Sequence, residues 1–140
     1  MAENNPQDRP YALKANAGWV YRYGVDFVVK AGEIQAGHGA AFLEYVTQAG
    51  EEPPAHTHDT EDEMFYVVEG ALTFQCGEER FDVEKGGFIF LPHGVEHTYQ
   101  IRSQEPVRLI VVTAPVRAGQ SGGWGGFVSD LEASQGELRD

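Results

Sequence analysis

The feature that most constrains the fold is a succession of short segments rich in β-branched and aromatic residues, separated by glycine, proline and acidic turns. Many short strands at this spacing predict an all-β sandwich or barrel. The predicted strands are WVYRY (19–23), DFVVK (26–30), AFLEYV (41–46), MFYVVE (64–69), ALTFQC (71–76), RFDV (80–83), FIFL (88–91), HTYQI (97–101) and VRLIVVT (107–113).

The chain of 140 residues divides into three predicted parts of one domain. Residues 1–17 are polar, and we expect an arm that is mobile or lies on a neighbouring surface. Residues 18–115 form the predicted barrel domain. Residues 116–140 contain the Gly-rich SGGWGG and a predicted short C-terminal amphipathic helix, whose apolar residues fall near one face: Trp124, Phe127, Val128, Leu131 and Leu138.

Composition excludes several classes of function. The net charge of −12 leaves no basic footprint for nucleic acid. No segment approaches the roughly 18 apolar residues of a membrane helix, and MAENNPQDRP lacks the basic start and apolar run of a signal peptide. We therefore expect a cytoplasmic protein with no membrane partner. The single cysteine, Cys76, excludes an internal disulfide and is expected to be a buried small hydrophobe.

The stretch PPAHTHDTEDEMFYVVEG (53–70) contains two of the five histidines. His56 and His58 point to the same face if the chain is extended, because side chains alternate along a strand. A turn through Asp59–Asp62 could bring Glu63, at the start of the next strand, to the same point. Two imidazoles and a carboxylate suit a divalent transition metal better than Ca²⁺ or Mg²⁺. Asp62 could replace Glu63, and ordinary surface histidines remain the alternative.

The segment GGFIFLPHGVEHTYQI supplies a further histidine. Pro92 and Gly94 form a turn that gives His97 a defined direction. A fourth ligand from a distant strand would close one side of a metal and leave other positions open, which distinguishes a reactive site from a structural one. His93 in the turn and His38 in the AGHGA loop are expected to face solvent.

The spacing of these residues resembles the two cupin motifs. The first is Gly50, five residues, His56, one residue, His58, four residues, Glu63, six residues and Gly70; the second runs from Gly86 over five residues to Pro92, then Gly94, two residues and His97. The resemblance covers residues 50–101. It implies a cupin-type double-stranded β-helix, or jelly-roll, barrel with metal ligands His56, His58, Glu63 and His97. The second motif often ends in Asn, where this chain has Ile101, so a polar contact is expected to be lost.

Together with FIFLPHGVEH and the tail after Pro115, the stretch 53–70 is similar to small bacterial quercetin-dioxygenase-like cupins. This similarity implies one divalent metal (Fe, Mn, Ni, Co, Cu or Zn). It also implies a dioxygenase that acts on a small enol or phenolic substrate with O₂, with Glu63 as ligand and catalytic proton acceptor. The alternatives are a non-redox isomerase, lyase or polyketide cyclase, and a cupin that only binds a small ligand.

Other residues are candidates for a substrate pocket. Glu44, the only charge within AFLEYV, could face the pocket or face water from an edge strand. Four aromatic residues could line the cavity or pack in the core: Phe65, Phe74, Phe90 and Tyr99. We also expect a homodimer that pairs through strands and exchanges residues 1–17 and the Trp124–Leu138 stretch.

Overall fold

The computed structural model describes residues 10–32, 40–116 and 136–140, and all regular structure in these ranges is β. None of the described residues forms a helix, and so none forms a membrane-spanning helix. The strands are β1 (Gly18–Tyr23), β2 (Val25–Ala31), β3 (Ala41–Thr47), β4 (Glu61–Glu69), β5 (Ala71–Cys76), β6 (Glu79–Glu84), β7 (Phe88–Leu91), β8 (His97–Ile101), β9 (Val107–Pro115) and β10 (Glu137–Arg139).

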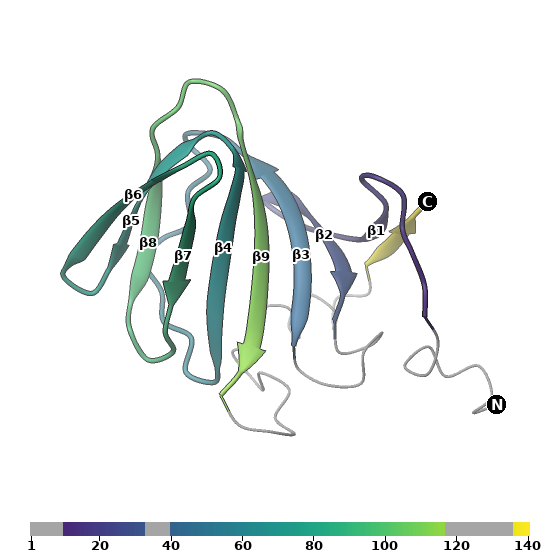
Figure 1. Ribbon diagram of the computed structural model, residues 1–140, viewed down its shortest axis with the longest axis horizontal. Helices are drawn as coiled ribbons and strands as arrows, with labels where there is room; N and C mark the ends of the chain where they lie inside the picture. The colour runs from purple at the N-terminus through teal and green to yellow at the C-terminus, as the bar shows by residue number, and fades with distance from the viewer. Residues whose placement is uncertain (1–9, 33–39, 117–135) are drawn as a thin grey trace.

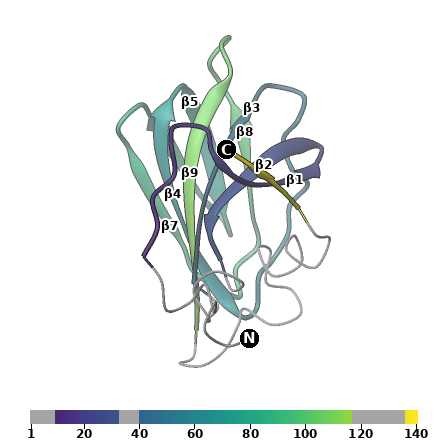
Figure 2. The ribbon, with the colours of Figure 1, turned by 90° about the vertical axis from the view of Figure 1, so that its right-hand side faces the viewer.

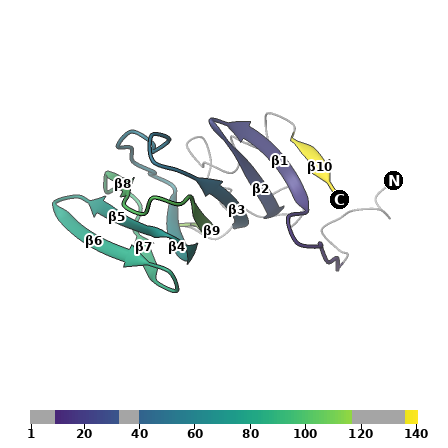
Figure 3. The ribbon, with the colours of Figure 1, turned by 90° about the horizontal axis from the view of Figure 1, so that it is seen from above.

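The strands form two antiparallel sheets (Figure 1). The larger has seven strands in the order β10-β1-β2-β3-β9-β4-β7, and the smaller has three in the order β6-β5-β8. Seen from above, the small sheet lies at the β4–β7 end of the large sheet, which continues through β2 and β1 to β10 (Figure 3). This arrangement is a jelly roll, so the all-β prediction is confirmed, and each of the nine predicted segments is part of a strand.

The core lies between the two sheets, and strict alternation of side chains along the strands supplies it. Along β3, Leu43 and Tyr45 are buried, whereas Phe42 and Val46 are exposed on the outer face. The same alternation continues along β4 and β9. Burial of these side chains is the main favourable contribution to folding. Fully enclosed members are Val29, Leu43, Val67, Leu72, Phe74, Val107 and Leu109.

The C-terminal residues form a strand where the sequence predicted a helix. Leu138 lies in β10 and is paired with Trp19 of β1. The yellow strand β10 lies beside β1 at the outer edge of the large sheet (Figure 2). The predicted helix is therefore wrong for the described part of the tail. The unpaired N–H and C=O groups of β1 provide a partner for an extended segment, and Leu138 remains 54% exposed. The other apolar residues of the predicted helix, Trp124, Phe127, Val128 and Leu131, lie outside the described residues.

The described part of the predicted N-terminal arm, residues 10–17, lies on the large sheet. The Tyr11 hydroxyl donates a hydrogen bond to the Lys30 carbonyl at 2.6 Å, and its ring contacts Trp19 edge-on at 5.9 Å. In return, the Lys30 ammonium donates to the Ala17 carbonyl at 2.5 Å. These contacts attach the arm to β1 and β2.

Candidate metal centre

Backbone pairing brings the two histidine motifs together. The His56 amide donates to the His97 carbonyl at 3.0 Å, and the His97 amide donates to the His56 carbonyl at 2.9 Å. The Gly94 amide in the turn before β8 donates to the His58 carbonyl at 2.8 Å. Glu63 projects inward from β4. Each predicted ligand is thus held by backbone hydrogen bonds or by a strand.

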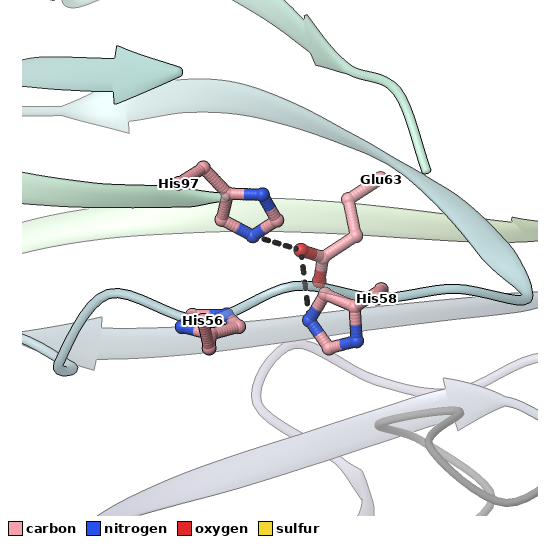
Figure 4. A group of neighbouring side chains, drawn as sticks. All are labelled: His56, His58, Glu63 and His97. Carbon is pink, nitrogen blue, oxygen red and sulfur yellow. Dashed lines mark ion pairs between the residues drawn. The ribbon is translucent and has the colours of Figure 1, made fainter. Parts of the chain in front are cut away.

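The four side chains converge on one point inside the barrel (Figure 4). One ligand atom from each of His56, His58, Glu63 and His97 lies within 4.8 Å of the others. Glu63 Oε1 is 3.0 Å from His97 Nε2 and 3.3 Å from His58 Nε2. His56 is half-buried and the other three are buried. The sequence named these four residues, and the structure brings all four together.

The polar atoms of this cluster fit a metal ion. Glu63 Oε1 and both ring nitrogens of His97 are buried and make no hydrogen bond among the described residues. Polar groups buried in this way cost free energy unless a partner satisfies them. Atoms 3.0–3.3 Å apart can share one ion at about 2.0–2.2 Å from each. Three imidazoles and a carboxylate could therefore hold one divalent transition metal.

The surroundings of His56 determine the tautomer and the protonation state of its imidazole. Its Nδ1 donates to the Pro54 carbonyl at 2.8 Å, which leaves the Nε2 lone pair for a metal. Burial lowers the pKa of His56, an effect that neighbouring His97 and His58 reinforce and that the hydrogen bond to Pro54 opposes. The neutral imidazole, which is the form that binds metals, is therefore favoured.

A second carboxylate, which was not among the predicted site residues, lies behind the four-residue cluster. Glu61 is 2% exposed, and its Oε1 is 3.5 Å from His58 Nδ1. The predicted strand began at residue 64, after a turn through Asp59–Asp62, whereas β4 begins at Glu61, which pairs with Pro115 of β9. Glu61 and Glu63 consequently share the inward face. Their i, i+2 spacing was the signal that could have found Glu61.

The alternative ligands lie elsewhere. Asp62 projects from the opposite face of β4, and its carboxylate accepts hydrogen bonds from the His93 amide at 2.8 Å and from His93 Nδ1 at 2.9 Å. Burial opposes this ionisation, but the His93 interactions prevail and lower the pKa of Asp62. His38 lies outside the described residues.

The metal centre opens into a cavity of about 430 Å³. Its apolar wall includes Phe27, Phe65, Leu91 and Val111, and two tyrosines complete the lining, Tyr45 and Tyr99. Their hydroxyls are hydrogen-bonded to each other at 3.0 Å. Burial, together with the Tyr99 hydroxyl and the Glu63 charge, raises the pKa of Tyr45 well above its usual value. Burial also raises the pKa of Tyr99 to about 12. Both hydroxyls therefore stay protonated at neutral pH.

The five residues proposed for the substrate pocket occupy three different places. Phe65 and Tyr99 line the cavity. Phe74 is fully buried in the core, where it packs on both of them. Phe90 is 49% exposed on the outer face of β7. Glu44 also faces outward and is not on an edge strand, since β3 lies between β2 and β9. The predicted pocket roles of Glu44, Phe74 and Phe90 do not fit these positions.

The outward position of Glu44 is stabilised by two cations. Its carboxylate lies 2.9 Å from an Arg108 guanidinium nitrogen and 3.7 Å from Lys30 Nζ. Ile101, which replaces the frequent Asn, is buried in the core, and its amide donates to Glu52 Oε2 at 3.1 Å. Cys76 is half-buried at the edge of the core, and burial raises the pKa of its thiol.

With the fold and the four-residue cluster established, comparison with known proteins identifies the family. The family described as Cupin domain matches residues 43–113, half of the chain, and this range contains all four clustered residues. The chain belongs to the cupin family. The cupin is 26% identical over 82 residues to an uncharacterized protein of Methanocaldococcus jannaschii. The match covers 59% of this chain and 66% of that protein, just under two thirds of its length.

Solved structures show the same fold. The cupin matches a predicted oxalate decarboxylase from Thermotoga maritima with a TM-score of 0.67 and 14% identity, over 76% of this chain and 100% of the other. It matches an RmlC-like cupin from Shewanella frigidimarina with a TM-score of 0.64 and 18% identity, over 81% of this chain and 96% of the other. At these identities the similarity concerns the fold alone.

Proposed function

We propose that this cupin is a metal-dependent dioxygenase that acts on a small enol or phenolic, quercetin-like substrate with O₂ as co-substrate. The observation that carries the proposal is a cluster of three histidines and one glutamate that opens directly into a cavity with aromatic walls. Enclosed, mostly apolar cavities with a few convergent polar groups are typical of small-molecule sites.

Each residue of the centre has a proposed role. His56, His58, Glu63 and His97 would hold one divalent metal, which when bound supplies Lewis acidity and, for a redox-active ion, electron transfer toward O₂. The Glu63 carboxylate, whose Oε1 makes no hydrogen bond among the described residues, would detach from the metal and accept the proton of a substrate hydroxyl.

The surroundings support this chemistry. Pro54 and Glu61 orient the rings of His56 and His58 from behind. The walls formed by Phe65, Leu91 and Val111 exclude water from the reacting groups and present apolar surface to an aromatic ring. A cavity of about 430 Å³ lies within the usual range for small organic ligands.

The test combines metal analysis with an oxygen electrode. We expect the purified protein to contain one metal per chain and to consume O₂ with a phenolic substrate, with both atoms of labelled O₂ recovered in the product. Glu63→Gln should abolish consumption, whereas Asp62→Asn, which alters the neighbouring outward carboxylate, should retain it. Turnover without O₂ would contradict the proposal and indicate an isomerase, lyase or cyclase. Ligand binding without turnover of any substrate would indicate a binding protein.

A further inference from the structure

When the histidines are neutral, all the charged side chains that line the cavity are negative. Three carboxylates line it, those of Glu51, Glu52 and Glu63, and no lysine or arginine of the described ranges does so. Cations close in sequence to cavity residues form ion pairs elsewhere: Arg22 pairs with Asp26, and Lys30 and Arg108 pair with Glu44 on the outer face. The chain as a whole carries −12. An anionic group deep in this cavity would have only the metal centre to neutralise it.

The two carboxylates at the mouth, those of Glu51 and Glu52, accept hydrogen bonds from backbone amides. Glu52 Oε1 accepts from the Gly50 amide at 2.7 Å. Hydrogen bonds from its own backbone amide and from those of Ile101 and Gly50 lower the pKa of Glu52. Glu51 Oε1 accepts from the Gln48 amide at 3.0 Å. These bonds fix two negative charges where a ligand must enter.

The tyrosine pair supplies a neutral donor to the same cavity. Tyr45 and Tyr99 carry one hydroxyl proton each, and the hydrogen bond between them uses one of the two. Among the described residues, no other hydrogen bond is made by either hydroxyl. One O–H of the pair therefore remains to donate to an acceptor oxygen of a ligand.

From these observations we propose that the cavity selects a ligand that binds the metal through its enol or phenol oxygens, has no additional anionic group, and offers a neutral acceptor oxygen to the Tyr45–Tyr99 pair. The inference rests on the proposed function, because it assumes a metal-binding substrate oxygen, and it narrows the substrate class. Carboxylated, sulfonated or phosphorylated phenols are excluded, since their second charge would be desolvated beside Glu51 and Glu52 without a cation.

The first test compares two probes that differ in charge and are nearly identical in shape. The Zn²⁺-loaded protein, which avoids redox turnover, is titrated calorimetrically with 3,4-dihydroxybenzamide and with 3,4-dihydroxybenzoate. We expect the amide to bind at least about tenfold more tightly, because an unpaired buried anion costs more than about 1.4 kcal/mol. Equal affinity, or tighter binding of the carboxylate, would overturn the proposal.

Two sets of variants test the groups involved. Tyr23 lines the mouth and is 75% exposed, so Tyr23→Arg adds a cation there with little effect on folding and should reduce the preference for the amide. Phe81→Arg, at an exposed position of β6 outside the cavity, is the matched control and should leave the preference unchanged. An unchanged preference in Tyr23→Arg would contradict the role of charge.

The donor is tested by the double variant Tyr45→Phe/Tyr99→Phe. It should bind the benzamide several-fold more weakly at unchanged Zn²⁺ content, whereas either single variant retains one proton and should lose less. Unchanged affinity in the double variant would overturn the role of the pair. All these readouts are binding affinities. Absence of O₂ consumption with the amide preference intact would therefore reject the dioxygenase alone, whereas O₂ consumption without the preference would reject this inference alone.

Discussion

Each histidine of the candidate metal centre is oriented by a different contact, and together these contacts determine which ring nitrogens are available to a metal ion. His56 is held through Nδ1 by the Pro54 carbonyl, and His58 Nδ1 faces Glu61. His97 is fixed through its backbone, which pairs with that of His56. In both His56 and His58 the Nε2 atom is left for the metal. Loss of such supporting contacts typically lowers metal affinity by about 10- to 100-fold.

Replacement of single histidines tests the assignment of the metal ligands. Removing the His58 imidazole by His58→Ala leaves three ligands and should lower metal content at least severalfold, measured by elemental analysis after dialysis. The matched control is His93→Ala, which removes a histidine bonded to Asp62 outside the cluster and should retain full metal content. Unchanged stoichiometry in His58→Ala, or loss in His93→Ala, would contradict the assignment.

The hydrogen bond between Tyr45 and Tyr99 predicts that the stability losses of the two single variants do not add up in the double variant. Either single change to Phe, at Tyr45 or at Tyr99, deprives the remaining buried hydroxyl of its partner and should cost about 1–3 kcal/mol of unfolding free energy. The double variant replaces both polar groups by apolar ones of the same shape and should be nearly as stable as the wild type. Urea denaturation of the four proteins measures this coupling, and additive losses would contradict it.

At the scale of the elements, β4 connects the site to the core. Its inward residues include Glu61 and Glu63 near its start, then Phe65 at the cavity and Val67 in the core. The strand ends at Glu69, and Gly70, with φ of +99°, turns the chain into β5. A Cβ at Gly70 would lie 2.3 Å from a Val107 methyl carbon and 3.0 Å from its Cα. The turn thus combines an unusual backbone conformation with tight packing.

Two glycines with nearly the same φ allow the cost of the backbone conformation to be measured separately from the cost of tight packing. Gly50, with φ of +100°, has no atom within 4 Å of an added Cβ. Gly50→Ala should cost about 1 kcal/mol of unfolding free energy, for the backbone conformation alone. Gly70→Ala should cost at least about 1–3 kcal/mol more, because Val107 must also move. Thermal or urea denaturation measures both, and equal losses would show that the packing around Gly70 is loose.

At the scale of the whole molecule, the outer face of the large sheet carries a group of exposed apolar side chains beside its charged residues. Its exposed side chains lie on β3, β4 and β7, in neighbouring register positions. Tyr66 is paired with Phe88 on one side and Ile110 on the other, and Met64 is paired with Phe90 and Val112. The large members that are more than two-fifths exposed are Phe42, Val46, Tyr66, Phe88 and Phe90. Contiguous apolar patches of this kind mark interaction surfaces.

We expect a homodimer in which two copies bury this outer face. Pairing of two copies through strands is less favoured at β1, because β10 of the same chain already covers that edge. The apolar face provides a stronger reason, since a two-fold axis can pair it with itself. Light scattering at micromolar concentration should give about twice the 15.4 kDa of one chain.

Charged substitutions identify the interface. Phe88→Asp/Phe90→Asp should give the single-chain mass, because it places charges in the buried face. Phe81→Asp, at a 40% exposed position of β6, is the control and should remain dimeric. A wild-type mass near 15.4 kDa would reject the dimer, and a dimer that survives the double substitution would place the interface elsewhere.

The sequence by itself determined the β class, the positions of nine strands and the four residues that could bind a metal. These features are local: strand segments have composition and turn signals, and ligand spacing within a motif is independent of the rest of the chain. The sequence did not predict which face of the sheet each side chain points to. Phe65 and Phe90 look alike as aromatic residues within strands, yet one lines the cavity and the other lies on the outer face.

Only the tertiary structure decided the remaining features, because each depends on contacts between distant segments. Pairing of Glu61 with Pro115 placed a second carboxylate inside the barrel. The facing of the two sheets brought together the hydroxyls of Tyr45 on β3 and Tyr99 on β8. Leu138 became part of a strand because β1 offered unpaired backbone groups with which it could pair. Local patterns report what a segment prefers, whereas burial and pairing depend on which neighbours the complete fold provides.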